Sequence, residues 1–380
     1  DDTINRNEGE IVSGGGVIYD KEISKITLKR SDLKLYSIPL NRIVEELKGR
    51  TIMRNTVALG AMLGLLDYDP TLLNQVLRDS FEARVADLNI TAAKGGYKYA
   101  KENYSNDFDY QLRKQEAKNK IVIQGNEAIG LGAINAGCKF YSAYPMTPLT
   151  GLLALMAEKE REHNMIVLQA EGEIAAINMV IGASYTGARA MTGTSGGGFC
   201  LMTEGLGLAA MTETPIVIVL GQRPGPSTGL PTYSAQGDLR FALHASQGEF
   251  PRVVVAPGDV EQYFYETVRA FNLAEKYQLP VIILVDKYGL ESDCEADLFD
   301  SRRIGIERGD LTTGEYHGGE AYRRYKITEN GVSPRALPLT KGALVRANSS
   351  EHDEDGFTTE KPGLTKEMNE KRFRKLNFLL

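Results

Sequence analysis

Two glutamates near the middle of the chain are the first candidates for chemistry. Glu171 and Glu173 come directly after a predicted strand over 165–170 and stand at the start of a predicted helix over 172–186. A helix dipole favours carboxylates at the N-terminus, which is a purely structural reason for both residues. A carboxylate directly after a buried strand nevertheless needs a partner, because burial without one is costly. The sequence favours Glu171 as the functional carboxylate and leaves Glu173 as the alternative.

A second candidate segment follows the predicted strand over 139–143 and opens a predicted helix over 147–163. Thr147 and Pro148 suit the N-cap and the first position of that helix, and spacing alone favours this structural interpretation. A hydroxyl beside free helix N–H groups also suits an anionic ligand. The candidates here are Tyr144, Pro145, Met146 and Thr147.

Three glycines and a long loop follow the next two predicted strands. Thr194, Ser195 and Gly196 begin a stretch in which glycines 196–198 would let the backbone approach a flat ligand closely, although a flexible turn is the alternative. The loop over 223–238 is long and rich in turn residues, and such loops are usually functional. The loop follows a strand, so we expect it to cover the cleft at the carboxyl ends of the strands.

The pattern from residue 118 onward predicts an α/β fold with a doubly wound parallel sheet. Strands alternate with helices, and strand segments such as 216–220 and 281–285 are continuously apolar, as in sheets buried on both faces. Such sheets bind ligands at the carboxyl ends of their strands. The predicted divisions are 1–85, a charged linker over 86–118, the α/β domain over 119–296, and a polar extension or arm over 297–380.

Composition narrows the possible functions. The 380 residues carry a formal net charge of -6 without a basic stripe, so a nucleic-acid partner is not expected. The apolar runs are too short to span a bilayer, which excludes a membrane partner. The three cysteines lie far apart and the four histidines show no metal spacing, so no metal site is expected in this chain. Cytoplasmic localisation is the default expectation.

Taken in order, these motifs resemble the alpha part of 2-oxoacid:ferredoxin oxidoreductases. The resemblance covers 119–360 and is carried by the Tyr-Pro-x-Thr-Pro motif, the Gln-Ala-Glu segment, the Thr-Ser-Gly stretch and the Pro-Ser-Thr-Gly-Leu-Pro-Thr loop, together with 346–352. Residues 53–60 resemble the end of the family's gamma domain, which makes 1–85 the C-terminal part of such a domain. The chain is therefore similar to a fused gamma–alpha subunit in partial form.

The resemblance implies a pyrimidine-binding domain of a thiamine-diphosphate enzyme that shares its cofactor with a beta subunit. That subunit would hold Mg²⁺ and a [4Fe-4S] cluster, and the complex would use CoA and a 2-oxoacid (pyruvate or 2-oxoglutarate) to reduce ferredoxin. The implied catalytic residues are Glu171 and Thr147, and the implied cofactor contacts are Tyr144, Pro145, Met146, Glu171, Thr194, Ser195 and Gly196. The implied substrate contacts are Thr147, Thr232, Tyr233 and Gln236.

Two other functions are compatible with parts of the pattern. A thiamine enzyme of the decarboxylase or transketolase type would carry a Gly-Asp-Gly motif in the same chain, whereas each Gly-Asp pair here is followed by Leu or Val. A non-catalytic, doubly wound binding subunit is the other alternative. Tyr233 departs from the family, in which the position after Thr232 is often basic, and this bears on the choice of 2-oxoacid.

Overall fold

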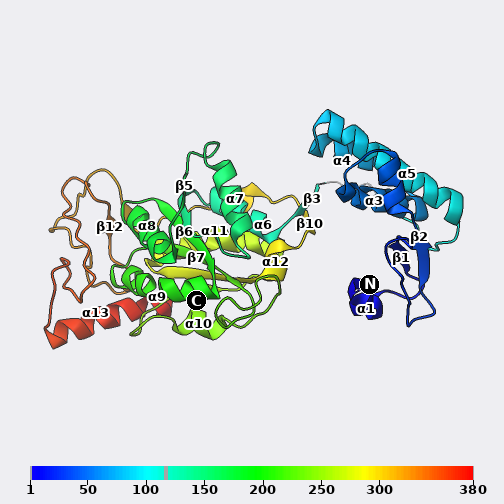
Figure 1. Ribbon diagram of the computed structural model, residues 1–380. Helices are drawn as coiled ribbons and strands as arrows, with labels where there is room; N and C mark the ends of the chain where they lie inside the picture. Colours follow the sequence, from blue (N-terminus) through cyan, green and yellow to red (C-terminus); the bar gives the residue numbers. More distant parts are fainter. Residues whose placement is uncertain (1, 115–118, 380) are drawn as a thin grey trace. The chain divides into compact units, whose positions relative to one another are not determined.

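The computed structural model describes residues 2–114 and 119–379 and divides the chain into two compact units, Asp1–Ala117 and Lys118–Leu380 (Figure 1). The first unit holds a two-stranded parallel sheet and a group of helices. Its elements are α1 (Asp2–Asn7), η1 (Glu8–Glu10), β1 (Gly16–Tyr19), β2 (Lys34–Ser37), α2 (Leu40–Glu46), η2 (Thr51–Met53), α3 (Arg54–Leu65), α4 (Thr71–Ser80) and α5 (Ala83–Tyr104).

Close packing of α3 against α5 holds the first unit together. A Cβ atom on Gly60 would lie 2.0 Å from the carbonyl oxygen of Ala93, and one on Gly96 would lie 2.0 Å from that of Val57. The two glycines therefore let the helix backbones meet where any other residue would separate them.

Most of the segment predicted as a linker, 86–118, is helical in the structure. Residues 86–104 belong to α5, whose buried face includes Ala86, Ala93 and Ala100. These residues are small and contribute little hydrophobicity, so the sequence suggested a surface linker. Their small size nevertheless allows the helices to pack closely. The end of the predicted linker, residues 115–118, lies outside the described residues.

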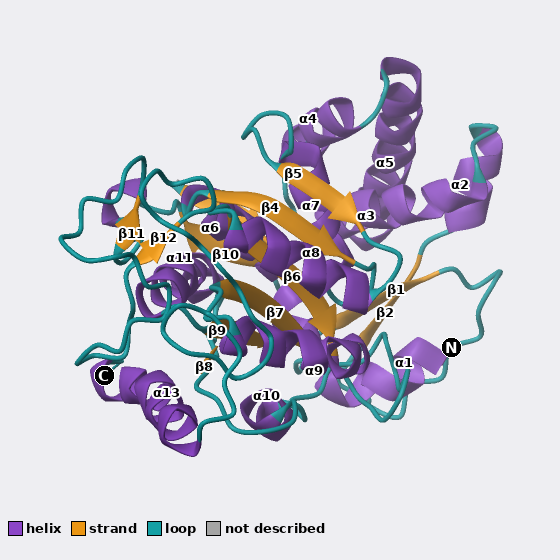
Figure 2. Cartoon of the chain, turned by 90° about the vertical axis from the view of Figure 1, so that its left-hand side faces the viewer, coloured by secondary structure: helices purple, strands orange, loops and turns teal. Residues whose placement is uncertain are grey.

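The second unit is built on a six-stranded parallel sheet in the order β5-β4-β6-β7-β9-β8 (Figure 2). The predicted doubly wound α/β fold is thus confirmed. The elements are β3 (Lys120–Ile123), α6 (Gly125–Asn135), β4 (Cys138–Ala143), α7 (Thr150–Lys159), β5 (Ile166–Gln169), α8 (Glu173–Tyr185), β6 (Arg189–Ser195), α9 (Gly196–Met211), β7 (Ile216–Gln222), α10 (Leu239–His244), β8 (Val253–Val255), α11 (Val260–Tyr277), β9 (Pro280–Asp286), α12 (Lys287–Glu291) and β10 (Cys294–Asp297).

Successive side chains of the central strands enter two different cores. Val217 and Val219 of β7 pack in the core that includes α6, α7 and α11, whereas Ile216, Ile218 and Leu220 pack in the core that includes α8, α9 and α10. This alternation explains why the strand sequences are continuously apolar, because both faces of the sheet are covered.

β3 does not join the main sheet, although the sequence predicts a strand there. It pairs antiparallel with β10, with Ile123 opposite Cys294, and forms a separate ribbon. A short apolar strand looks the same in sequence whichever partner it has, so the pattern alone could not assign it.

The C-terminal segment, predicted as an extension or arm, packs onto the second unit. Its elements are η3 (Ser301–Arg303), β11 (Leu311–Thr312), β12 (Arg335–Ala336), α13 (Pro362–Arg374) and η4 (Lys375–Phe378). Lys371 and Lys375 reach Glu213, in the turn before β7, at 2.5 and 2.6 Å, and all three side chains are buried. The two lysines lower the pKa of Glu213 against the opposing effect of burial.

We predict that Glu213→Gln destabilises the second unit, because it leaves two buried ammonium groups without their carboxylate. Breaking a buried ion pair of this kind costs about 3–5 kcal/mol. Chemical denaturation of the full chain measures the loss, and Glu204→Gln, at an exposed position of α9, is the control expected to change the free energy of unfolding by less than about 0.5 kcal/mol. Equal stability of the two variants would show that these ion pairs do not anchor the segment.

Candidate active site

The predicted site residues come from adjacent strands and lie at one edge of the sheet. Tyr144 to Thr147 follow β4, Glu171 follows β5, Thr194 and Ser195 end β6, and the loop over 223–238 follows β7. All of these strands are parallel, so their carboxyl ends share an edge. The chain direction across the sheet reverses between β4 and β6, and ligands of open α/β sheets bind at such a reversal.

Contrary to the prediction, Thr147 does not cap the helix that follows it. Thr147 and Pro148 form a turn closed by a hydrogen bond from the Leu149 N–H to the Met146 carbonyl (2.9 Å), and α7 begins only at Thr150 with Leu149 at its N-cap. The carbonyl of Thr147 instead accepts a hydrogen bond from the Arg223 guanidinium at 2.7 Å. The segment is therefore held by the loop after β7 rather than by its own helix.

The two glutamates have opposite environments, and the shelter expected for Glu171 is found at Glu173 instead. Glu171 is exposed, whereas Glu173, the first residue of α8, is 3% exposed. Among the described residues, none makes a hydrogen bond to the Oε1 atom of Glu173. A buried carboxylate oxygen without a partner is costly, so this atom is a candidate for binding a ligand.

A signal for Glu173 is present in the sequence. It occupies the same stripe of α8 as Ala176, Ile177, Val180 and Ile181, the positions that face the core. That phase of three and four residues turns Glu173 inward, whereas Glu171 precedes the N-cap Gly172 and lies outside the helix. The choice of Glu171 overlooked this phase.

The three glycines form the first turn of α9 and are not a flexible turn. Ser195 is the N-cap, and β6 before it is buried over its whole length. A Cβ atom on Gly198 would lie 2.0 Å from the Thr194 Oγ1 atom and 2.5 Å from the Glu173 Oε1 atom. Glycine at 198 is thus what allows the carboxylate to lie against the helix.

The loop over 223–238 and the first turn of α9 enclose a cavity of about 560 Å³. Of the predicted residues, Met146 and Gly196 line it, and the Thr194 hydroxyl contacts the Met146 sulfur at 3.7 Å. The lining also includes Arg223, Ser227, Thr228 and Asp238 of the loop predicted to cover the cleft, and Cys200, which the sequence did not single out. Two of the predicted cofactor contacts, Met146 and Gly196, therefore meet this loop at one opening.

The three predicted substrate contacts of the loop lie away from this lining. Tyr233 is 57% exposed, Thr232 is exposed, and the amide of Gln236 donates to Asp286 at 2.6 Å. The base of the loop is closed by a hydrogen bond from the Asp238 N–H to the Gln222 side chain at 3.0 Å. These bonds fix both ends of the loop and leave its middle exposed.

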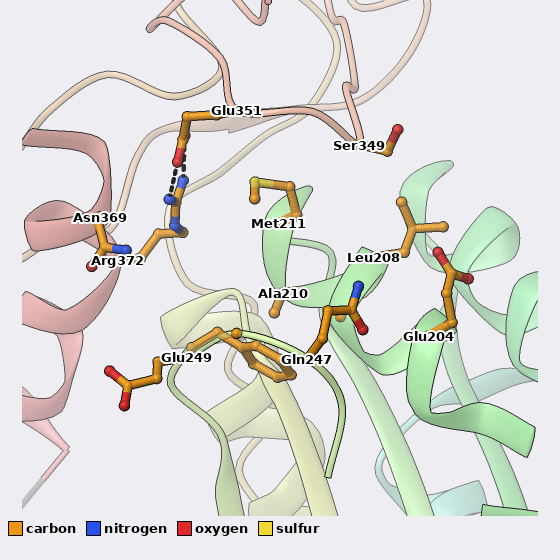
Figure 3. Close-up of a pocket in the computed structure, with 13 residues that line it drawn as sticks. Glu204, Leu208, Ala210, Met211, Gln247, Glu249, Ser349, Glu351, Asn369 and Arg372 are labelled. Atoms are coloured by element: carbon orange, nitrogen blue, oxygen red, sulfur yellow. Dashed lines mark hydrogen bonds and ion pairs between the residues drawn. The ribbon is translucent and has the colours of Figure 1, made fainter. Parts of the chain in front are cut away.

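A second cavity, of about 350 Å³, lies at the other end of α9 (Figure 3). Glu204 and Met211 line it together with Glu351 and Arg372, which form an ion pair at 2.6 Å. None of the predicted site residues takes part in its lining. The cavity at the carboxyl edge of the sheet is therefore the candidate active site.

Over residues 2–114 and 119–379, no helix is long and apolar enough to cross a membrane. In the same ranges, no group of three or more His, Cys, Asp or Glu side chains is arranged to hold a metal ion.

Two family models match the chain. The model described as "Pyruvate flavodoxin/ferredoxin oxidoreductase, thiamine diP-bdg" covers residues 131–370, which include the whole candidate site. The chain belongs to this family. A second model, "Pyruvate ferredoxin/flavodoxin oxidoreductase", covers residues 1–99. The resemblance drawn from the motifs is confirmed, and the matched region of the second unit is a thiamine-diphosphate-binding domain.

Named relatives agree with this assignment. The chain is 39% identical to a 2-oxoacid:ferredoxin oxidoreductase subunit alpha of Saccharolobus solfataricus, over 85% of this chain and 52% of that one. It is 51% identical to a 2-oxoglutarate synthase subunit KorA of Archaeoglobus fulgidus, over 44% of this chain and 48% of that one. The chain thus spans about half the length of these relatives.

A solved structure shares the fold across the chain. It is a 2-oxoglutarate:ferredoxin oxidoreductase from Magnetococcus marinus with 2-oxoglutarate, coenzyme A and succinyl-CoA bound. The TM-score is 0.89 at 37% identity, over 99% of this chain and 66% of that one.

We predict that Gly198→Ala disturbs the site, because the added methyl group would overlap the Thr194 hydroxyl and the Glu173 carboxylate. Overpacking of this kind costs about 1–3 kcal/mol, measured as a loss of free energy of unfolding. Gly182→Ala is the matched control, since a Cβ there meets nothing within 4 Å in the middle of α8. It should raise stability by about 0.5–1 kcal/mol. A gain for both variants would show that Gly198 is not needed for space.

Proposed function

We propose that this chain supplies the pyrimidine-binding half of the active site of a 2-oxoacid:ferredoxin oxidoreductase. With a beta subunit, it would convert a 2-oxoacid and CoA into acyl-CoA and CO₂ while ferredoxin is reduced. The observation that carries the proposal is the buried Oε1 atom of Glu173, which lies at the carboxyl edge of the sheet without a hydrogen-bond partner among the described residues.

The residues around Glu173 fit the aminopyrimidine ring of thiamine diphosphate. A carboxylate that accepts a hydrogen bond from a protonated ring nitrogen forms a charge-assisted bond, which is stronger when water is excluded. Gly198 leaves the carboxylate uncovered by a side chain, and Met146 offers an apolar contact at the adjacent strand end. When bound, thiamine diphosphate supplies the electron sink for decarboxylation.

Proton control at the ring is therefore assigned to Glu173 rather than to Glu171. Both residues follow the same strand, but only Glu173 is sheltered. Glu173 would hold a proton at the ring nitrogen and so stabilise the form of the cofactor that can remove a proton from its own reactive carbon. The proposed contacts of Tyr144, Pro145, Thr194, Ser195 and Gly196 with the cofactor remain predictions.

Arg223 is the best-placed group for the carboxylate of the substrate. It lines the cavity and is held by the Thr147 carbonyl at 2.7 Å, and a guanidinium carries five N–H donors suited to a carboxylate. Thr147 remains a proposed substrate contact through the same turn. Thr232 and Tyr233 would have to act from the outer side of the loop, and Gln236 from a separate cavity that it lines together with Gln222 and Asp286.

The remaining components are assigned to the beta subunit. Mg²⁺ with the diphosphate half of the cofactor site and the [4Fe-4S] cluster are proposed there, because this sequence has no Gly-Asp-Gly motif and its three cysteines lie far apart. Pyruvate and 2-oxoglutarate are the proposed substrates, and ferredoxin is the proposed electron acceptor. The exposed, free thiol of Cys200 fits a reducing compartment, so we place the complex in the cytoplasm.

We predict that Glu173→Gln in the assembled complex slows hydrogen–deuterium exchange at the reactive carbon of thiamine diphosphate. The amide keeps the shape of the side chain but loses its charge, and the expected loss is on the order of a hundredfold, the weight of a general acid–base group. Nuclear magnetic resonance of the quenched cofactor measures the rate. Glu171→Gln is the matched control and should exchange like the unmodified complex. Slowed exchange in Glu171→Gln alone would return the role to Glu171, and no change in either variant would contradict the proposed function.

A further inference from the structure

A second carboxylate at the candidate site has no structural task. Asp238 is the N-cap of α10, a position where an aspartate usually accepts a hydrogen bond from its own helix, but its side chain makes no such bond. The Oδ2 atom is buried and, within the described part of the chain, has no hydrogen-bond partner. The side chain is turned toward α9 instead, since a Cβ atom on Gly196 would lie 2.8 Å from Oδ2.

Asp238 and Glu173 lie at opposite ends of the same three glycines. Asp238 contacts the position of Gly196, and Glu173 contacts that of Gly198. Asp238 lines the 560 Å³ cavity together with Arg223, so any 2-oxoacid held by Arg223 brings its own carboxylate into the cavity that holds Asp238. A second carboxylate close to the buried Oδ2 atom of Asp238 disfavours the ionised form of Asp238, because like charges repel.

The charged and titratable groups near Asp238 are few. Arg223 lies after β7 and the Cys200 thiol lies on α9, both in the cavity lining. Glu173 is across the first turn of α9, and Asp286, the last residue of β9, accepts a hydrogen bond from Gln236. On α10 itself, Arg240 and His244 are exposed. Burial raises the pKa of Asp238, which brings its protonation closer to neutral pH.

We propose that Asp238 couples 2-oxoacid binding to the uptake of one proton. The proton comes from solvent, binds the Asp238 carboxylate as the substrate carboxylate enters, and returns to solvent when the site empties. This inference rests on the proposed function, because it needs a 2-oxoacid in the cavity. Asp238 then favours substrate binding at lower pH, and by linkage the bound substrate raises the affinity of Asp238 for its proton.

The direction of the pH dependence follows from the two protonation states. Below the pKa of Asp238 in the empty site, the carboxyl is already neutral and affinity does not change with pH. Between that pKa and the higher pKa in the substrate complex, affinity falls by up to about tenfold per pH unit as pH rises. Above both pKa values the substrate binds weakly and takes up no proton.

The test is calorimetric titration of the assembled complex, freed of thiamine diphosphate so that no decarboxylation exchanges protons with the buffer, with pyruvate and with 2-oxoglutarate, in two buffers of different ionisation enthalpy and over a range of pH. The expected result is an uptake that reaches at most one proton per site within this window. Pyruvamide, which has no carboxylate, should bind without proton uptake. Asp238→Asn should abolish the uptake and make affinity independent of pH, whereas Asp238→Glu should retain both effects.

Glu204→Gln, an exposed carboxylate variant at the far end of α9, is the control and should keep the full proton uptake. Uptake that persists unchanged in Asp238→Asn, or that is absent from the unmodified complex while substrate binds, would overturn the assignment to Asp238. If Asp238→Asn does not fold, the comparison of pyruvate with pyruvamide and the Asp238→Glu variant still decide. An unmodified complex that binds neither 2-oxoacid at any pH would contradict the proposed function itself.

Discussion

The carboxylate of Glu173 lies inside the protein beside the first turn of α9, and removing a carboxylate from water costs several kcal/mol when nothing compensates it. Several features of the candidate site are needed to keep this carboxylate buried. Gly198 must lack a side chain, and the phase of α8 must turn position 173 inward while its other core positions stay apolar. A ligand that donates a hydrogen bond to this oxygen would supply the missing compensation.

Two other buried carboxylates of the second unit are paired with cationic side chains. At the amino edge of the sheet, Glu213 is held by two lysines, and Glu275 is held by Arg189 at 2.9 Å and Arg335 at 3.3 Å. At the carboxyl edge, Glu173 and Asp238 each keep a buried oxygen without a hydrogen-bond partner, and neither carboxylate forms an ion pair among the residues described. The contrast separates charges that hold the fold from charges available to a ligand.

Much of this architecture could be predicted from the sequence, because alternating strands and helices with continuously apolar strands have few other solutions. The same pattern predicted that the site lies at the carboxyl edge of the sheet. The pairing of β3 with β10 and the packing of α5 could not be predicted, since both depend on which partner a short or weakly apolar segment meets. The loop over 223–238 was predicted to cover the cleft, but no individual role could be given to Arg223 or Asp238, because their positions depend on bonds that tie the ends of the loop to Thr147 and Gln222.

The central claim is that Glu173 holds the pyrimidine ring of thiamine diphosphate. The most direct test is an experimental structure of the assembled complex with the cofactor bound. The account predicts an oxygen of the Glu173 carboxylate within about 2.7–2.9 Å of the ring nitrogen opposite the carbon that carries the amino group, as in other charge-assisted hydrogen bonds. A ring nitrogen bound by Glu171, or a pyrimidine ring placed away from the turn formed by Gly196 to Gly198, would contradict it.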